Sequence, residues 1–298
     1  MKIAYLTDRD ALGGGGEYIR RQIAAHAADE TRVFFAEKGE CTAARMDAWG
    51  AELVHVNHLK ALLQLLRNPL RRPRGRIVFV VHGIHWRKYG FLPKTAGNRL
   101  KRFLRLRLER WLYARVDELV ALNRDDVELR RTTYRVKVPI RLEPNTVAPM
   151  AVKPSEAPAF AFVAVARFDF QKGHDTLLEA IALAQDRLRA SGRRTLLIGD
   201  GEELPAMKAL AERRGIADLV EFAGALPNAA REMRRGGILV APSRWEGSPY
   251  AVLEALAQGM KVLASDCPGN RDLVQPPTNG WLFPVDDVDA LADLLVRV

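Results

Sequence analysis

Cysteine and long apolar runs are both scarce in this sequence. Cys41 and Cys267 are the only cysteines among 298 residues, and no metal-ligand spacing surrounds either, which predicts free thiols and a cytoplasmic location. No apolar run approaches the roughly 20 residues that a membrane-spanning helix needs, and the first residues turn polar too early for a secretory signal. The composition, 48% hydrophobic and 28% charged, is typical of a globular protein with room for two domains.

Acidic residues are almost missing from one long segment. Residues 60–116 hold 16 basic residues and a single acid, Glu109. Residues 1–150 carry a net charge of +13, whereas residues 151–298 carry −3. This asymmetry predicts an anionic partner for the first half, such as nucleic acid, a phospholipid surface or a phosphorylated glycan.

Short apolar runs typical of strands alternate with helical patterns along the whole chain. Strands are expected at residues 2–7, 31–36, 52–56, 76–81, 118–122 and 137–143, and in the second half at 160–166, 195–200, 219–224, 237–242, 261–265 and 281–283. Residues 176–188 show a helical period between two of these strands. The alternation predicts an α/β protein whose parallel sheets are covered by helices on both faces.

A proline-rich segment separates the two halves. Residues 144–159 hold four prolines, which cannot continue a helix or an inner strand. We therefore expect an N-terminal domain at 1–146, a linker at 147–158 and a C-terminal domain at 159–298. Both domains should be doubly wound and face each other across a cleft, and ligands of such sheets bind beyond the carboxyl ends of the strands.

Two strand ends in the first half hold candidate ligand contacts. Gly14, Gly15 and Gly16 run into a predicted helix, where the backbone can approach a phosphate or carboxylate closely; a flexible turn without chemical use is the alternative. His82 follows the fourth strand, where it either contacts a sugar hydroxyl or a developing charge, or only caps the strand.

The second half opens with two cations at a strand end. Arg167 and Lys172 lie between the strand at 160–166 and the next predicted helix, where they could bind a diphosphate and stabilise a departing phosphate. Solvated surface positions are the alternative. Gly199 and Gly201 flank Asp200 at the following strand end, a weak signal that is most often structural.

Two glutamates lie eight positions apart in the stretch SRWEGSPYAVLEA at residues 243–255. Glu246 precedes a Gly-Ser-Pro turn, and Glu254 stands inside the apolar segment after that turn. The role of an acid inside an apolar segment depends on what the rest of the chain builds around it.

A basic helix is expected over residues 98–116. Its Leu, Phe and Trp residues repeat at helical spacing, which indicates a face buried in the core. The arginine excess on the other face, with Arg99, Lys101, Arg102 and Arg105, suits a membrane surface with anionic lipid. Nucleic acid is disfavoured, because no recognition-helix, zinc-finger or stacking-sheet pattern accompanies the charge.

Taken in order, these motifs resemble the retaining glycosyltransferases of family 4, which have the GT-B fold of two Rossmann-like domains. The residues that carry the resemblance are GGGE at 14–17, HG at 82–83, Arg167 with KG at 172–173, and Glu246 with Glu254 as an E-x7-E motif. It covers essentially the whole chain. The single motifs are weak, whereas their ordered set is specific.

The resemblance implies that the second domain binds a nucleotide-sugar, with UDP-sugars the commonest donors, and that the first domain holds the acceptor. Glu246 would contact the donor sugar and Glu254 the ribose hydroxyls. Gly247, Ser248 and Tyr250 would lie against the sugar and the diphosphate.

The resemblance also implies a mechanism without a protein nucleophile, metal or other cofactor. The departing phosphate would take the proton of the acceptor hydroxyl, while Arg167 and Lys172 stabilise the diphosphate. NTVA at 145–148 departs from the family's usual Asn-Gly-Val-Asp. The chain ends at Val298, before further helices that relatives usually carry, so a short C-terminal domain is expected.

The expected function is therefore hexosyl transfer at the cytoplasmic face of a membrane, to a lipid-linked or phosphorylated glycan of the cell envelope. Two alternatives stay open. One is another GT-B enzyme, such as a sugar-nucleotide epimerase or a phosphorylase. The other is a non-catalytic subunit that binds a nucleotide-sugar.

Overall fold

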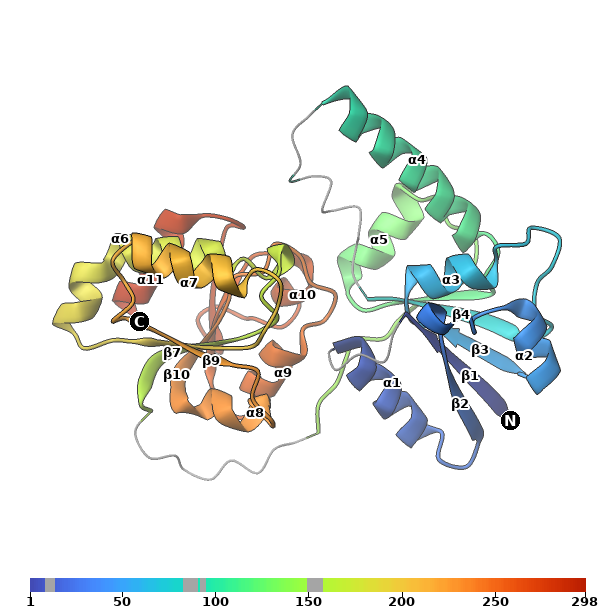
Figure 1. Ribbon diagram of the computed structural model, residues 1–298, viewed down its shortest axis with the longest axis horizontal. Coiled ribbons are helices and arrows are strands. Elements are labelled where there is room, and N and C mark those ends of the chain that lie inside the picture. The colour runs from blue at the N-terminus through green and yellow to red at the C-terminus, as the bar shows by residue number, and fades with distance from the viewer. Residues whose placement is uncertain (9–13, 83–90, 92–94, 149–157) are drawn as a thin grey trace. The chain divides into compact units, whose positions relative to one another are not determined.

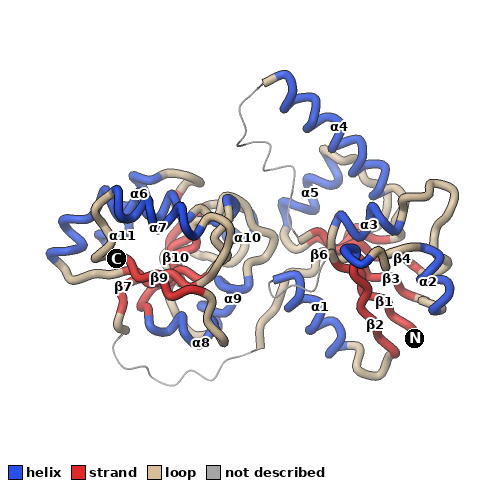
Figure 2. Tube along the Cα trace, viewed as in Figure 1, coloured by secondary structure: helices blue, strands red, loops and turns tan. Residues whose placement is uncertain are grey.

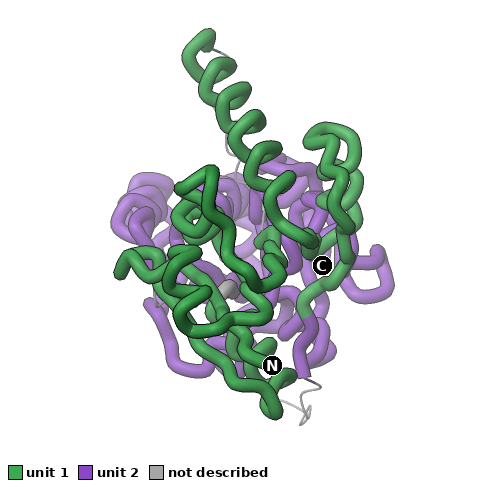
Figure 3. The backbone as a smooth tube through the Cα atoms, turned by 90° about the vertical axis from the view of Figure 1, so that its right-hand side faces the viewer, with its two compact units in different colours: residues 1–145 green, residues 146–298 purple. Residues whose placement is uncertain are grey.

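The computed structural model describes residues 1–8, 14–82, 91, 95–148 and 158–298, in two compact units (Figure 1). Unit 1 spans Met1–Asn145 and unit 2 spans Thr146–Val298 (Figure 3). Each unit contains one six-stranded sheet with helices packed against it (Figure 2). Gly83 and most of the expected linker lie outside the described residues.

The sheet of unit 1 is parallel throughout. Its strands, in chain order, are β1 (Lys2–Thr7), β2 (Glu30–Phe35), β3 (Leu53–Val56), β4 (Arg76–Val81), β5 (Glu118–Ala121) and β6 (Ile140–Leu142). The order across the sheet is β2-β1-β3-β4-β5-β6, so the winding direction reverses between β1 and β3. Residues of β1 and β4 are buried in continuous runs, as expected for strands covered on both faces.

Helices of unit 1 begin at residues that favour a helix start. They are α1 (Gly14–Ala25), α2 (Ala43–Trp49), α3 (Leu59–Leu65), α4 (Ala96–Tyr113) and α5 (Arg124–Thr132), with a short 3₁₀ turn η1 (Ala36–Lys38). The side chains of Thr42, Thr95 and Asn123 cap α2, α4 and α5 by accepting a hydrogen bond from the backbone three residues on.

Unit 2 repeats the doubly wound plan with a different strand order. Its strands are β7 (Phe160–Val165), β8 (Thr195–Ile198), β9 (Val220–Gly224), β10 (Gly236–Ala241), β11 (Lys261–Ser265) and β12 (Gly280–Phe283). All pairs are parallel, in the order β12-β11-β10-β7-β8-β9. Here the winding direction reverses between β7 and β10, because the chain builds outward from β7 in one direction and from β10 in the other.

Helices cover both faces of this second sheet. They are α6 (His174–Ala190), α7 (Leu204–Arg213), α8 (Ala229–Glu232), α9 (Tyr250–Ala257), α10 (Pro268–Arg271) and α11 (Val288–Arg297), with 3₁₀ turns η3 (Phe170–Lys172) and η4 (Met233–Arg235). Leu177, Ile181 and Leu291 are fully buried in the core on the face covered by α6 and α11. Val252 and Ala255 of α9 are buried in a second cluster, with Val163 and Leu239.

The expected α/β fold class of two doubly wound parallel sheets is confirmed, and every expected strand is present. The strand expected at 137–143 is shorter, because β6 begins only at Ile140. Pro139 before it has no N–H to donate, although its carbonyl accepts the amide of Leu119 at 2.9 Å. Gly14, Gly15 and Gly16 form the first turn of α1 rather than the loop before it. Among the helices that the structure describes, none is long and apolar enough to cross a bilayer.

Candidate functional site

The candidate site of unit 2 lies at the point where its winding direction reverses. β7 and β10 are neighbours, and their carboxyl ends lead into residues 166–172 and 242–246. In a doubly wound sheet the loops at this point diverge to opposite faces and leave a crevice between them, which is where such folds bind ligands. Lys172 comes from the first of these segments and Glu246 from the second.

Lys172 and Glu246 meet directly. The Lys172 Nζ atom lies 2.7 Å from Glu246 Oε1, and their side chains are 19% and 9% exposed. The Ser243 hydroxyl donates to the same oxygen at 2.7 Å, whereas the Gln171 amide reaches Oε2 at 3.4 Å. Oε2 therefore keeps the capacity to accept a hydrogen bond from a ligand hydroxyl. A half-buried ammonium beside it offers positive charge to an anion.

Arg244, which belongs to the second of these segments, also contacts the first. Its side chain is 6% exposed, and it bridges Asp175 at 2.7 Å and Asp286 at 2.9 Å. It also donates to the carbonyl of Phe170 at 2.7 Å, and its guanidinium lies 4.1 Å from the centre of that ring. Because Phe170 belongs to η3, which ends at Lys172, Arg244 fixes the turn that presents the lysine.

Charge around Arg244 favours its ionised form. Burial opposes the charge, but the hydrogen bond and charge of Asp175 and the charge of Asp286 together raise the pKa of Arg244 above its ordinary value. The backbone amide of Arg244 also donates to the carbonyl of Gln171 at 2.8 Å. The two strand-end segments are thus joined by side chain and main chain.

Arg167 stands apart from this buried network. Its side chain is 59% exposed and pairs with Asp169 at 2.8 Å. Exposed pairs of this kind are worth little, typically about 0–1 kcal/mol. Arg167 can therefore exchange its partner for a ligand anion at little cost, while Lys172 is held in place by Glu246.

The expected donor contacts after Glu246 follow the same edge of the sheet. Gly247 and Ser248 are buried, and Tyr250 begins α9 after Pro249, whose side chain provides no cap for the helix. Glu254 lies half-buried in the second turn of α9. No side chain at the N-cap position of α9 accepts a hydrogen bond from the first amides of the helix, and the N-terminal end of a helix favours an anion.

Gly199 and Gly201 have a packing role. Both have positive φ, at +148° and +158°. A Cβ on Gly199 would lie 1.8 Å from the carbonyl oxygen of Ala166, and one on Gly201 would lie 2.4 Å from that of Phe168. The close approach of two strand ends therefore accounts for both glycines, and their expected contact with a donor stays a prediction.

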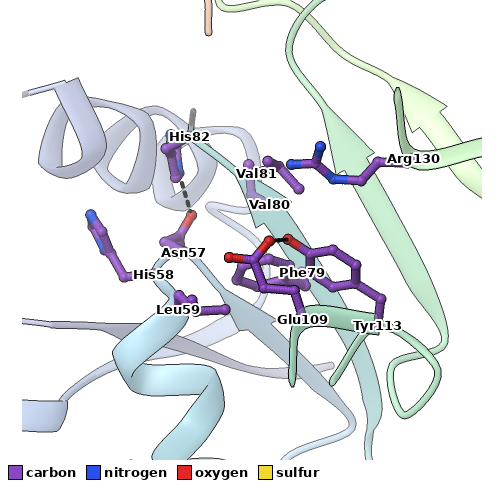
Figure 4. A pocket seen from close by; sticks show the side chains of 10 residues that line it. All are labelled: Asn57, His58, Leu59, Phe79, Val80, Val81, His82, Glu109, Tyr113 and Arg130. Carbon is purple, nitrogen blue, oxygen red and sulfur yellow. Dashed lines mark hydrogen bonds between the residues drawn. The ribbon is translucent and has the colours of Figure 1, made fainter. Parts of the chain in front are cut away.

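In unit 1, His82 follows β4 and lies beside Asn57 and His58, which follow β3 (Figure 4). Its Nε2 atom lies 3.2 Å from Asn57 Oδ1, and its ring stacks against that of His58 with the ring centres 5.7 Å apart. His58 Nδ1 is 3.0 Å from the hydroxyl of Thr7, at the end of β1. His82 is thus oriented by two neighbours that follow β3, and one of them, His58, is itself held by Thr7 of β1. This arrangement suits a group that contacts a substrate hydroxyl.

Behind His82 lies a cavity of about 10 Å³, room for about one water molecule. Glu109 lines it and accepts hydrogen bonds from Tyr134 at 2.6 Å and Tyr113 at 3.3 Å. Arg105 donates to the same carboxylate at 2.6 Å. Arg105, expected on the basic surface, is therefore turned inward, and it neutralises the one acid of the basic segment.

The first half of α4 differs from the expected helix with one face in the core. Leu100, Phe103 and Leu104 are 57%, 53% and 56% exposed, beside the exposed basic residues Arg99, Lys101 and Arg102. The expectation of a buried apolar face is wrong for this half, because it extends beyond the sheet it would pack on (Figures 1 and 3). Leu112 and Tyr113, near the end of α4, are buried as expected.

Sequence reasoning missed several residues of both sites. In unit 1 these are Asn57 and His58, and in unit 2 they are Gln171, Ser243 and Arg244. Asn57, His58 and Ser243 come within two residues of a strand end, so the rule that drew attention to His82 also applies to them. Nothing in the sequence pattern marks Arg244 as buried.

Both halves of the chain match known protein families. Residues 11–149 match the family described as Glycosyltransferase Family 4, and residues 159–298 match Glycosyl transferases group 1. EpsD of Bacillus subtilis is 26% identical over 265 residues, which are 83% of this chain and 67% of EpsD. The Escherichia coli UDP-Gal:alpha-D-GlcNAc-diphosphoundecaprenol alpha-1,3-galactosyltransferase is 26% identical over 239 residues, which are 74% of this chain and 59% of that enzyme.

A solved structure with the same fold is that of HepE from Anabaena in complex with UDP and glucose. It superimposes with a TM-score of 0.75 at 18% identity, over 99% of this chain and 89% of HepE. This likeness confirms the expected GT-B fold class. The match to the galactosyltransferase spans less than two thirds of that enzyme's length.

Replacing Arg244 by lysine should destabilise unit 2 far more than the same change at Arg189. Lysine keeps the charge but cannot reach Asp175, Asp286 and the Phe170 carbonyl together, so we expect a loss of roughly 3 kcal/mol in the free energy of unfolding. Arg189 pairs with the exposed Asp218, and its replacement should change little. Urea unfolding of both variants measures the difference; equal losses would contradict the role assigned to Arg244.

Proposed function

The chain belongs to the glycosyltransferases, with a family 4 region in unit 1 and a group 1 region in unit 2, and on this premise we propose that it is a retaining hexosyltransferase. It takes a hexosyl unit from a nucleotide-sugar, with a UDP-sugar favoured, and transfers it to a membrane-associated or phosphorylated acceptor in envelope polysaccharide or lipopolysaccharide biosynthesis. The pairing of Lys172 with Glu246, where the winding of unit 2 reverses, is the observation that carries this proposal.

Unit 2 supplies the donor site in this proposal. Lys172 and Arg167 bind the diphosphate, the exposed Arg167 by exchanging its partner Asp169 for a phosphate oxygen. Glu246 accepts a sugar hydroxyl at Oε2, because its other oxygen is occupied by Lys172 and Ser243. Glu254 accepts the two ribose hydroxyls. Support for UDP comes from the HepE complex and from the UDP-Gal named in the Escherichia coli relative.

Retention of configuration follows from attack on the face that the leaving group vacates. The bond between the anomeric carbon and the phosphate oxygen breaks, and the acceptor hydroxyl oxygen bonds to that carbon. Its proton passes to the departing phosphate, so no side-chain nucleophile takes part. Lys172 and Arg167 stabilise the charge that develops on the diphosphate, the role a cation plays in such transfers.

Unit 1 supplies the acceptor side. His82, oriented by Asn57 and His58, contacts the acceptor hydroxyl or the sugar in transfer. The exposed first half of α4 combines basic and apolar side chains, the composition of a helix that lies on a membrane surface. We assign this helix to peripheral attachment at the cytoplasmic face, where anionic lipids attract Arg99, Lys101 and Arg102.

Calorimetric titration of UDP-, GDP- and ADP-sugars tests the donor site. We expect one nucleotide, most readily a UDP-sugar, to bind the unmodified chain and to bind Glu254→Gln about 10-fold or more weakly, since two hydrogen bonds to a charged acceptor are lost. Glu212→Gln, an exposed change on α7, serves as the control and should leave the affinity unchanged. Equal affinity in both variants would remove Glu254 from the donor site.

Vesicle sedimentation tests the membrane assignment. Replacing Arg99, Lys101 and Arg102 together by glutamine should weaken binding to phosphatidylglycerol-containing vesicles by about 3 kcal/mol, roughly a hundredfold, at low salt. Pure phosphatidylcholine vesicles should bind neither protein well. A control with Arg187, Lys208 and Arg213 of unit 2 replaced by glutamine has the same net charge, and the assignment fails if it loses as much binding.

A further inference from the structure

An apolar groove lies between α3 and α4 of unit 1. Leu63 and Leu66 of the α3 side face Trp111 of α4, and Gln64 and Arg67 complete the lining. Its volume is about 400 Å³, within the range of pockets that take small organic ligands. Trp111 remains 40% exposed there, which is unusual for a large aromatic side chain on a helix that otherwise ends in the core.

The walls of this groove are held by polar contacts outside it. The Gln64 side chain accepts the backbone amide of Cys41 at 2.9 Å and donates to the carbonyl of Ala36 at 3.2 Å. Arg115 lies 4.7 Å from the centre of the Trp111 ring and donates to the carbonyl of Pro69. The opening is therefore a built feature of unit 1, with both helices fixed on either side of it.

The groove continues the exposed apolar stripe of α4. Leu100, Leu104 and Trp111 stand at positions i, i+4 and i+11, which fall on one side of a helix, and the exposed Arg107 at i+7 lies on the same side between Leu104 and Trp111. Basic residues accompany this stripe along its length, with Arg107 lying 5.7 Å from the ring centre of Phe103 and Arg67 in the groove itself. An occupant must therefore be apolar in the groove and anionic beside it.

We propose that this groove holds part of the hydrocarbon chain of a lipid-linked acceptor, next to its phosphate or diphosphate group. This inference rests on the proposed function and names the acceptor class as a polyprenyl phosphate or diphosphate. The surrounding positive charge argues against a second copy of this chain, because two such surfaces repel each other. The charge is complementary to the head group of the lipid, and the stripe leads from it into the groove.

Binding of monomeric geranylgeranyl diphosphate to the full chain tests this inference. We expect Trp111→Glu to weaken its binding about 10-fold or more, because it places a charge where an apolar chain would be buried. Trp111→Phe keeps an apolar ring in the groove and should retain binding within about twofold. The loss in Trp111→Glu then comes from the charge placed in the groove and not from the absence of tryptophan. Leu142→Glu changes a side chain of similar exposure, 42%, in β6 and should bind normally.

Three outcomes would overturn the proposal. The first is equal binding of the probe by Trp111→Glu and Leu142→Glu. The second is competition by inorganic diphosphate as strong as that by the full probe, which would mean that only the head group is recognised. The third is binding of anionic vesicles without binding of the monomeric probe, which would mean that only a membrane surface is recognised. Titration of a UDP-sugar into the same samples separates the two proposals. UDP-sugar binding without probe binding overturns the groove alone, whereas probe binding without any nucleotide-sugar binding overturns the donor site alone.

Discussion

The buried guanidinium of Arg244 is the group on which the geometry of the candidate site in unit 2 depends. It joins α6 through Asp175, the segment after β12 through Asp286, and η3 through the Phe170 carbonyl. Each of these contacts alone is modest, but one planar group with several fixed donors makes them together. Lys172 and Glu246 therefore meet at 2.7 Å without having to order a mobile loop at the moment of binding. Such preorganisation lowers the entropy lost when the ligand binds.

Topology explains why these residues meet at all. At the point where the strand order reverses, two neighbouring parallel strands continue into loops that turn to opposite faces of the sheet. These loops leave a crevice beyond the strand ends, and side chains from both loops line it. Unit 2 does this with β7 and β10, and unit 1 does it with β1 and β3. In unit 1 the result is the contact between Thr7 at the end of β1 and His58 after β3. Asn57, also after β3, contacts His82, which follows the next strand, β4. The two sheets thus use one physical rule for two different sites.

Much of this architecture could be predicted from sequence because continuous apolar runs separated by helical periods are a strong signal for buried parallel strands. The candidate acids and cations could also be found, since they follow strand ends. What could not be predicted was pairing. Nothing in the sequence tells that Lys172 is held by Glu246, that Arg167 stays exposed and pairs with Asp169, or that Arg105 turns inward to Glu109. The exposure of the leucines of α4 could not be predicted either, because helical spacing identifies an apolar face but not whether another element covers it.

A crystal structure of the protein with bound UDP tests the central claim most directly, that the Arg244-supported turn presents Lys172 to a diphosphate. The account predicts that Lys172 Nζ lies about 3 Å from a β-phosphate oxygen, with Arg244 still bridging Asp175 and Asp286. A diphosphate bound away from Lys172, or bound only after the Arg244 contacts have opened, would contradict it.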